Sequence, residues 1–237
     1  MRILTQADVL ALWEAGRSLH PLDQGVLAVQ AAFPEVRESV ADWPLGRRNR
    51  ALAELRVATF GAGLRGWMAC RQCAEQLEFE MDGRALAKGE VPAQGTQIDV
   101  YGRSYRLPTS SDLAAVATEN DSTAAARRLL SRCCTNGEGM TSNETVWSDE
   151  EMEAIGERMA AADPLAEILL SFECPNCAAS FVESLDLPAF LWAEMEGRAK
   201  RLLLEVHALA SAYGWSEREI LALPPVRREF YLGQVRA

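Results

Sequence analysis

The chain has 237 residues, 49% of them hydrophobic and 24% charged, a composition typical of a folded globular protein with a substantial core. Its formal net charge of −10 argues against a partner bound through a basic nucleic-acid surface and favours a protein partner. No apolar run reaches the roughly 18–20 residues of a membrane span, and the first residues lack the apolar stretch of a signal peptide. We therefore expect a cytoplasmic protein whose six cysteines stay reduced.

Residues 1–66 are expected to form a helical N-terminal part. Thr5 and Asp8 imitate a capping box, and the apolar residues that follow recur on one helical face. Further helices are expected over residues 23–33 and 47–60, and the second of these begins with basic side chains.

Those basic side chains are Arg47, Arg48 and Arg50. Cations are unfavourable at the N-terminal end of a helix, because the helix dipole is positive there. The cluster therefore indicates a surface that meets carboxylates of a partner, although a solvated helix face gives the same pattern.

Residues 67–108 are expected to hold the first cysteine pair and β-strands. Cys70 and Cys73 have the C-x-x-C spacing of metal-binding turns. Residues 77–81 alternate between apolar and acidic side chains, which predicts a half-buried strand, and residues 98–107 are a second strand region. We expect these strands to complete a small sheet beside the cysteines.

Residues 109–164 are interpreted as a helical insertion. The periodicity predicts helices over residues 112–119 and 124–134, and a serine and a glutamate form a capping box for a third helix over 149–162. The polar stretch near residues 135–147 is expected to be a mobile loop.

The second C-x-x-C pair, Cys174 and Cys177, lies in residues 165–186 between two strand-like runs, the shape of half a zinc ribbon. Four thiolates from two such pairs are the ligand set of a closed tetrahedral Zn²⁺ site, with Cys70, Cys73, Cys174 and Cys177 as ligands. Because no coordination position stays open, the zinc is expected to be structural. We therefore predict a mainly α fold with a small β zinc-ribbon element, in which this site joins the N- and C-terminal helical parts.

The cysteines also allow interpretations other than a metal site. A thioredoxin-type oxidoreductase uses a single reactive C-x-x-C pair, so two pairs far apart in sequence make this the weaker alternative. Cys133 and Cys134 are adjacent at the end of a predicted helix, where cysteine is usually a small buried apolar group, and we assign them no function.

Residues 187–237 are expected to form a C-terminal helical hairpin. Asp186 caps a long helix that ends at Gly214, and Ser216 with Glu219 forms a capping box for the next helix. The glycine between the helices is typical of a helix-turn-helix, so a DNA-binding regulator is an alternative. The second helix is acidic and apolar, which favours packing or partner docking over DNA binding.

The same segment holds candidate partner contacts, since aromatic side chains beside arginine are a common hot-spot pairing. The candidates are Trp215, Arg227, Arg228, Phe230 and Tyr231. Ordinary packing under the helical hairpin remains an equally good interpretation of Trp215 and Tyr231.

An enzyme is the weaker class of function for this sequence. The chain has two histidines, and His207 falls in the apolar stripe of the long helix, as expected for a structural histidine. We find no G-x-S-x-G elbow, no phosphate-binding glycine loop and no H-E-x-x-H motif.

Several stretches that together span most of the chain resemble a single family. These stretches are Pro44–Asn49, Leu52–Arg56, Phe60–Gly61, the first cysteine pair with Leu77–Glu78, Arg106–Thr109 with Asp112–Leu113, Cys174–Cys177, and Val206–Glu217 with Ile220–Leu223. They resemble the T4-type baseplate hub assembly chaperones, which are found beside tail genes of contractile phages and phage-like contractile injection systems. The stretch Tyr213–Glu217 is the most specific of them.

The resemblance implies a non-enzymatic tail protein that acts in the cytoplasm of the producing bacterial cell, on or in the baseplate hub. Its implied partners are baseplate hub or other tail proteins, with no membrane and no small-molecule substrate. The resemblance covers both a chaperone that leaves after assembly and a subunit that stays in the particle.

Overall fold

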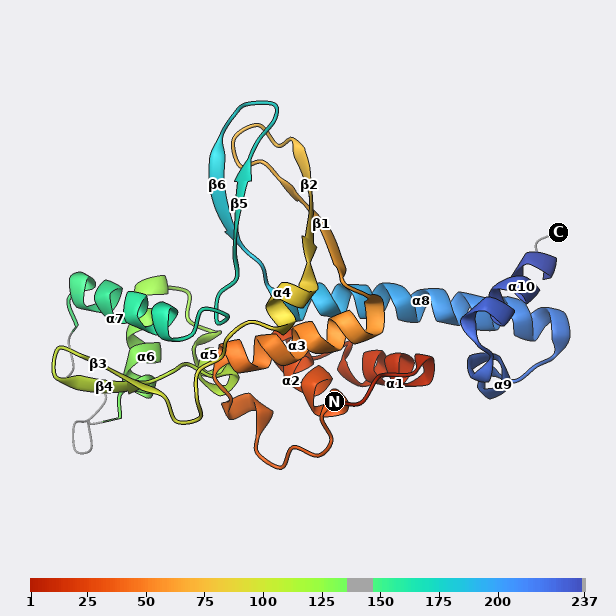
Figure 1. Ribbon diagram of the computed structural model, residues 1–237, viewed down its shortest axis with the longest axis horizontal. Helices are drawn as coiled ribbons and strands as arrows, with labels where there is room; N and C mark the ends of the chain where they lie inside the picture. Colours follow the sequence, from red (N-terminus) through yellow and green to blue (C-terminus); the bar gives the residue numbers. More distant parts are fainter. Residues whose placement is uncertain (136–146, 236–237) are drawn as a thin grey trace.

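The structure is a computed structural model that describes residues 1–135 and 147–235 (Figure 1). Helices make up most of this described chain, and its strands form three two-stranded antiparallel sheets. The prediction of a helical chain with small β elements is therefore confirmed at this level. The loop predicted near residues 135–147 falls almost entirely outside the described residues.

The elements in chain order separate into helices and strands with the following bounds. The helices are α1 (Gln6–Gly16), α2 (Pro21–Ala32), the 3₁₀ turn η1 (Val40–Asp42), α3 (Leu45–Phe60), α4 (Gly83–Ala87), α5 (Ser110–Val116), α6 (Ser122–Cys133), α7 (Asp149–Ala162), α8 (Leu187–Tyr213), α9 (Glu217–Ala222) and α10 (Pro225–Val235). The strands are β1 (Gly63–Ala69), β2 (Gln76–Asp82), β3 (Gln97–Val100), β4 (Arg103–Arg106), β5 (Leu169–Glu173) and β6 (Ser180–Ser184).

The long helix α8 is the axis of the molecule (Figure 1). Helices α1, α2 and α3 pack against its first part, and α9 and α10 fold back on its far end. Two β-hairpins stand side by side on the other side of α8, namely the first hairpin (β1–β2) and the second hairpin (β5–β6). Helices α6 and α7 with the β3–β4 hairpin form a separate cluster at the end away from α10.

The main core lies between α2, α3 and the beginning of α8. Leu52 and Leu55 of α3 have no exposed surface, as their three-residue spacing on one helix face predicts. They meet Leu191 and Met195 of α8, each 1% exposed. Burial of each such side chain stabilises the fold by roughly 2 kcal/mol. This interface therefore holds the N-terminal helices against the C-terminal helix α8.

The helix boundaries follow capping signals that the sequence predicts. Within residues 1–135 and 147–235, four capping boxes are formed, by Thr5 with Asp8, Thr109 with Asp112, Ser148 with Glu151 and Ser216 with Glu219. In each, the N-cap hydroxyl accepts a hydrogen bond from a first-turn N–H that has no partner within its helix. Asp186 caps α8, which ends at Gly214 with φ at 69°, a left-handed conformation that glycine adopts without steric penalty.

The strand region predicted at residues 98–107 is confirmed, but its expected place is wrong. It holds the two strands of the β3–β4 hairpin, turned at Tyr101 and Gly102 with φ of 51° and 73°. This hairpin does not lie beside the cysteines, because Ile98 and Tyr105 are buried against α6 and α7. Strand β1 was not predicted at all, and it is the partner of β2.

The start of α3 depends on a residue far along the chain. The N-cap of α3 is Pro44, which offers no side-chain acceptor, and the buried carboxylate of Asp163 takes its place. Its Oδ2 accepts a hydrogen bond from the Gly46 N–H at 2.9 Å. A Cβ on Gly46 would lie 1.7 Å from Asp163 Oδ1, so only glycine fits this contact.

Gly46→Ala is therefore expected to destabilise the protein by roughly 1–3 kcal/mol, because the new methyl group overpacks a buried site and displaces the cap. Gly156→Ala in α7 is the matched control, since nothing lies within 4 Å of a Cβ there. That control should stabilise the protein by up to about 1 kcal/mol through helix propensity. Denaturant unfolding measures both, and equal effects would contradict the assigned role of Gly46.

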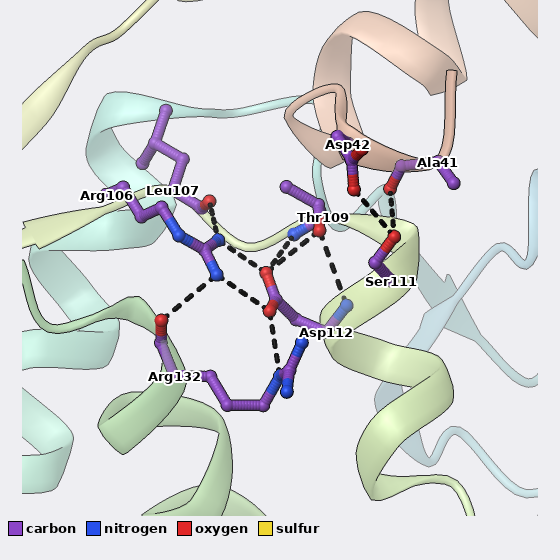
Figure 2. A network of polar contacts seen from close by, with 8 residues as sticks. All are labelled: Ala41, Asp42, Arg106, Leu107, Thr109, Ser111, Asp112 and Arg132. Atoms are coloured by element: carbon purple, nitrogen blue, oxygen red, sulfur yellow. Dashed lines mark hydrogen bonds and ion pairs between the residues drawn. The ribbon is translucent and has the colours of Figure 1, made fainter. Parts of the chain in front are cut away.

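A polar network around Asp112 connects β4, α5 and α6 (Figure 2). The Asp112 side chain is 1% exposed, and it accepts hydrogen bonds from the Thr109 N–H and hydroxyl and from the guanidinium groups of Arg106 and Arg132. Beside it, Ser111 donates to the carbonyl of Ala41 and the carboxylate of Asp42, which ties α5 to η1.

These contacts set the pKa of Asp112. Burial of the carboxyl raises the pKa, but the hydrogen bonds from Arg106 and Thr109 and the Arg106 charge outweigh burial and lower it from 3.8 to about 2. A carboxyl whose pKa is lower in the folded than in the unfolded chain stabilises the fold above the unfolded value, and this stabilisation is lost as pH falls toward the folded value.

The Asp112 charge is thus expected to contribute about 2 kcal/mol at neutral pH and to lose this contribution between roughly pH 4 and pH 2. Asp112→Asn should remove it at pH 7 and flatten the loss of stability between pH 4 and pH 2. Urea unfolding at a series of pH values measures the effect. An unchanged acid profile in the variant would contradict this assignment.

Candidate metal centre

The cysteines of the two C-x-x-C pairs meet at the tips of the two hairpins. The four sulfur atoms of Cys70, Cys73, Cys174 and Cys177 lie within 4.8 Å of one another. The Sγ atoms of Cys70 and Cys177 are 3.7 Å apart, and those of Cys73 and Cys174 are 3.6 Å apart. A tetrahedral thiolate site with metal–sulfur bonds of about 2.3 Å separates its sulfur atoms by about 3.8 Å, so these distances fit a single ion.

The two cysteine-bearing turns have the same backbone structure. In the first, the Cys70 N–H donates to the Glu75 carbonyl at 2.8 Å and the Ala74 N–H donates to the Cys70 carbonyl at 2.9 Å. In the second, Cys174 and Ala178 make the equivalent bonds at 2.9 and 2.8 Å. Ala74 and Ala178 have φ of 60° and 56°, so both turns hold an alanine in the left-handed region. Because the two turns share this geometry, each turn presents its two cysteine sulfur atoms in the same way.

The hairpins pack against each other below the cysteines. The rings of Phe79 and Phe172 meet edge to face with centroids 5.8 Å apart, and Phe172 stacks on Phe181 at 5.7 Å. Near the tip, the Arg71 guanidinium of the first hairpin pairs with the Glu183 carboxylate of the second. The cysteines are therefore brought together by two separate hairpins and not by a single continuous loop.

The protein environment favours thiolate at part of the cluster. Hydrogen bonds from the backbone N–H groups of Cys73 and Gln72 lower the pKa of the Cys70 thiol to about 7. The Asn176 side-chain amide lies 3.6 Å from the Cys73 sulfur and donates toward it. Cys70 and Cys174 are buried, 3% and 1% exposed. Four converging sulfur donors, two of them buried, make this cluster compatible with a bound metal ion.

Cys133 lies apart from this cluster, in the packed region of α6, α7 and the β3–β4 hairpin. It has no exposed surface, and burial raises the pKa of its thiol to about 12. This confirms the prediction of a small buried apolar group for Cys133. Cys134 next to it is half-buried and faces Tyr105 across an isolated β-bridge.

Of the predicted arginine cluster, Arg48 is not a surface residue. It is 4% exposed, and its guanidinium donates to Asn49 Oδ1 at 2.9 Å and to Ser110 Oγ at 2.9 Å. The prediction of a partner contact at Arg48 is wrong, because this side chain turns inward and bonds to Asn49 and to Ser110 at the start of α5.

The other two arginines of that cluster also make contacts within the chain. The Arg47 guanidinium stacks on the Trp43 ring at 3.8 Å and pairs with Glu38 at 2.5 Å. Arg50 pairs with Glu54 one turn along α3 at 3.5 Å. Both stay partly exposed, so their predicted contact with a partner remains a prediction.

Among the C-terminal candidates, Arg228 is buried. It is 2% exposed and pairs with Glu205 of α8 at 2.6 Å, with Gln6 of α1 as a second partner. The predicted partner contact at Arg228 is therefore wrong, because α10 folds back on α8 and uses this side chain as an internal tie. Arg227 and Phe230 are exposed, Phe230 at 64%, and remain candidates.

Trp215 and Tyr231 lie in an aromatic cluster with Tyr213. Trp215 stacks on Tyr213 with centroids 4.7 Å apart, and Tyr231 meets Trp215 edge to face at 5.0 Å. These contacts favour ordinary packing of α10 on the end of α8. His207 was expected in the buried stripe of α8, and this was wrong, since it lies on the exposed face of the helix.

Scans of protein-family models, curated proteins and solved structures found no match to this chain. Among the described helices, none has both the length and the apolar composition needed to span a bilayer.

Cys174→Ser is expected to abolish stoichiometric metal binding and to destabilise the fold, because binding of a structural metal is part of the folding free energy. The loss should be smaller than the roughly 10 kcal/mol found in small zinc-dependent peptides, since a large core remains. Metal analysis of the purified protein and thermal unfolding measure both effects.

Cys133→Ala is the matched control and should retain one ion per chain, because Cys133 lies outside the cluster. Cys177→Ser, at a half-buried position of the cluster, provides a second test if Cys174→Ser does not fold. A Cys174 variant that is as stable as the parent and still binds metal would refute the role of that residue.

Proposed function

We propose that Cys70, Cys73, Cys174 and Cys177 hold one structural Zn²⁺ in a zinc-ribbon arrangement. The observation that supports this is the closed set of four thiol donors at tetrahedral spacing, contributed by two matching turns. Soft thiolate ligands in tetrahedral geometry favour Zn²⁺ or iron over hard cations. With all four positions taken by sulfur, the ion fastens the two hairpins and leaves no position for a substrate.

The function that we propose is that of a non-enzymatic binding protein of a contractile phage tail or phage-like injection system. In this role the protein assists assembly of the baseplate hub or forms part of it. The proposal is supported by the resemblance of stretches such as Tyr213–Glu217 to baseplate hub assembly chaperones. A metal centre that acts as a fastener and an acidic chain are consistent with binding to other proteins.

Metal identity is tested by elemental analysis of protein purified without added metal. We expect about one zinc per chain. An iron–thiolate site would absorb visible light, so a coloured protein with stoichiometric iron would contradict zinc. A metal-free cluster with one fast-reacting thiol would instead support the oxidoreductase alternative.

Partner binding is tested by co-expression of the tagged chain with each baseplate hub protein and with the other tail proteins of the same system. We expect a stable complex with a hub component that survives size-exclusion chromatography, and the chain's presence in purified particles separates a subunit from a transient chaperone. Absence of a complex with every baseplate protein, or salt-dependent binding to duplex DNA, would contradict the proposal.

A further inference from the structure

An apolar groove lies between the two hairpins and α8, with a volume of about 530 Å³. Its walls come from Met68 and Phe79 of the first hairpin and from Leu170 and Phe172 of the second, and Phe190 of α8 lies at its base. Gly66 helps to shape it, because a Cβ there would lie 2.6 Å from the Phe79 ring. The Phe79 ring therefore packs directly on the Gly66 backbone, in space that a side chain at this position would fill.

A tryptophan borders this groove and is largely exposed. Trp67 of β1 is 66% exposed, whereas Trp43, Trp147 and Trp192 are each at most 7% exposed. An exposed large aromatic side chain next to an apolar groove is typical of a protein-binding surface. Along β1, Leu64 points inward and is 1% exposed, so the strand turns one face to the core and presents Trp67 on the other.

The surroundings of Trp67 carry an excess of negative charge. Trp67 and Glu78 are directly opposite each other in the β1–β2 register, and both border a second, more polar hollow with Glu80. Glu80 is neutralised by Arg65 at 3.0 Å, but within the described part of the chain no cation pairs with Glu78.

The carboxylates on the other side of the groove have partners within the chain. Glu183 and Glu194 are paired with Arg71 and Arg56, respectively. The Asp186 carboxylate caps α8 by accepting a hydrogen bond from the Ala189 N–H at 3.0 Å, and it interacts electrostatically with the buried Arg48. The groove therefore combines an apolar floor with an uncompensated carboxylate near its edge, that of Glu78 opposite Trp67.

We propose that this groove is a docking site for an apolar segment of a partner protein that is flanked by Lys or Arg. The apolar side chains of the segment fill the space between the hairpins. Its flanking cation lies over the Trp67 ring and near Glu78, where cation–π attraction and the uncompensated carboxylate act together. This site deepens the proposed function, on which it rests, by assigning the chemistry of the partner segment.

The groove also depends on the metal centre. Its two walls belong to hairpins that are joined beyond the groove by the cysteine cluster and at the groove by the Arg71–Glu183 pair. Without the metal, only this ion pair and the phenylalanine contacts hold the walls together, so the groove loses its fixed width. Docking is therefore expected to require the metal-loaded protein.

The test uses labelled peptides of about 12 residues with a leucine- and phenylalanine-containing centre. One set has Lys and Arg at both ends, and the other has the same centre with Glu at both ends. We expect fluorescence anisotropy to show saturable binding of the basic set. The dissociation constant of the acidic set should be at least about tenfold higher. Chelator-treated protein should bind neither set.

Two variants of the groove have matched controls elsewhere on the surface. Trp67→Ala should weaken binding of the basic set at least about tenfold, whereas Val226→Ala, at an 81% exposed position of α10, should not change it. Glu78→Lys should weaken binding about threefold or more, whereas Glu157→Lys, on the exposed face of α7, should leave it unchanged.

Equal binding of both peptide sets, no binding of either, or binding unaffected by Trp67→Ala would overturn the groove as a basic-segment site. Concentration-dependent self-association of the chain that Trp67→Ala abolishes would overturn it too, in favour of a second copy as occupant. If the Trp67→Ala protein still forms a complex with a baseplate component, the groove proposal fails and the proposed function stands. If the basic peptides bind but no baseplate protein does, the proposed function fails and the groove stands as a binding site for basic segments.

Discussion

The convergence of four thiols at the hairpin tips is the contact on which the arrangement of the β elements depends. The two hairpins share no strand pairing with each other, and the first precedes the β3–β4 and α5–α7 segments while the second follows them. Residues that lie 101 and 107 positions apart thereby become neighbours at 3.6 and 3.7 Å. A two-stranded hairpin alone is marginally stable in water, so joining two of them converts a weak element into a rigid one.

Around this thiol cluster, buried polar contacts between distant segments position the helices. Asp163 caps α3 across 117 residues, Asp112 joins three elements, and Arg228 ties the last helix to α8. Each is an ionisable side chain that is almost completely buried and bonded to specific partners, although Asp163 Oδ1 accepts no hydrogen bond. Such groups contribute less to net stability than to the choice of one arrangement, because any other arrangement would leave a buried charge without its partner.

The features that could be predicted from the sequence are those with local causes. Capping residues such as Ser148 and Ser216 act within one turn, and C-x-x-C spacing follows from the size of a metal ion, so both were visible. Burial of Arg48 and Arg228 follows from which helices pack together, and no local pattern carries that information. Strand β1 had a visible signal, the alternation of Leu64 and Met68 with Arg65 and Trp67, but Gly66 interrupts it and obscured the strand.

The two alanines that follow the cysteine pairs connect metal binding with the backbone. Ala74 and Ala178 occupy the left-handed region, which is unfavourable by roughly 1 kcal/mol for any residue with a Cβ. In the metal site that we propose, this backbone preference would oppose the geometry that the ion requires, and part of the binding free energy would be used to hold it. Glycine at these positions would preorganise the turns for the ion, whereas alanine would make their shape depend on its presence. Binding of the proposed ion would therefore also fix the backbone of the hairpin tips.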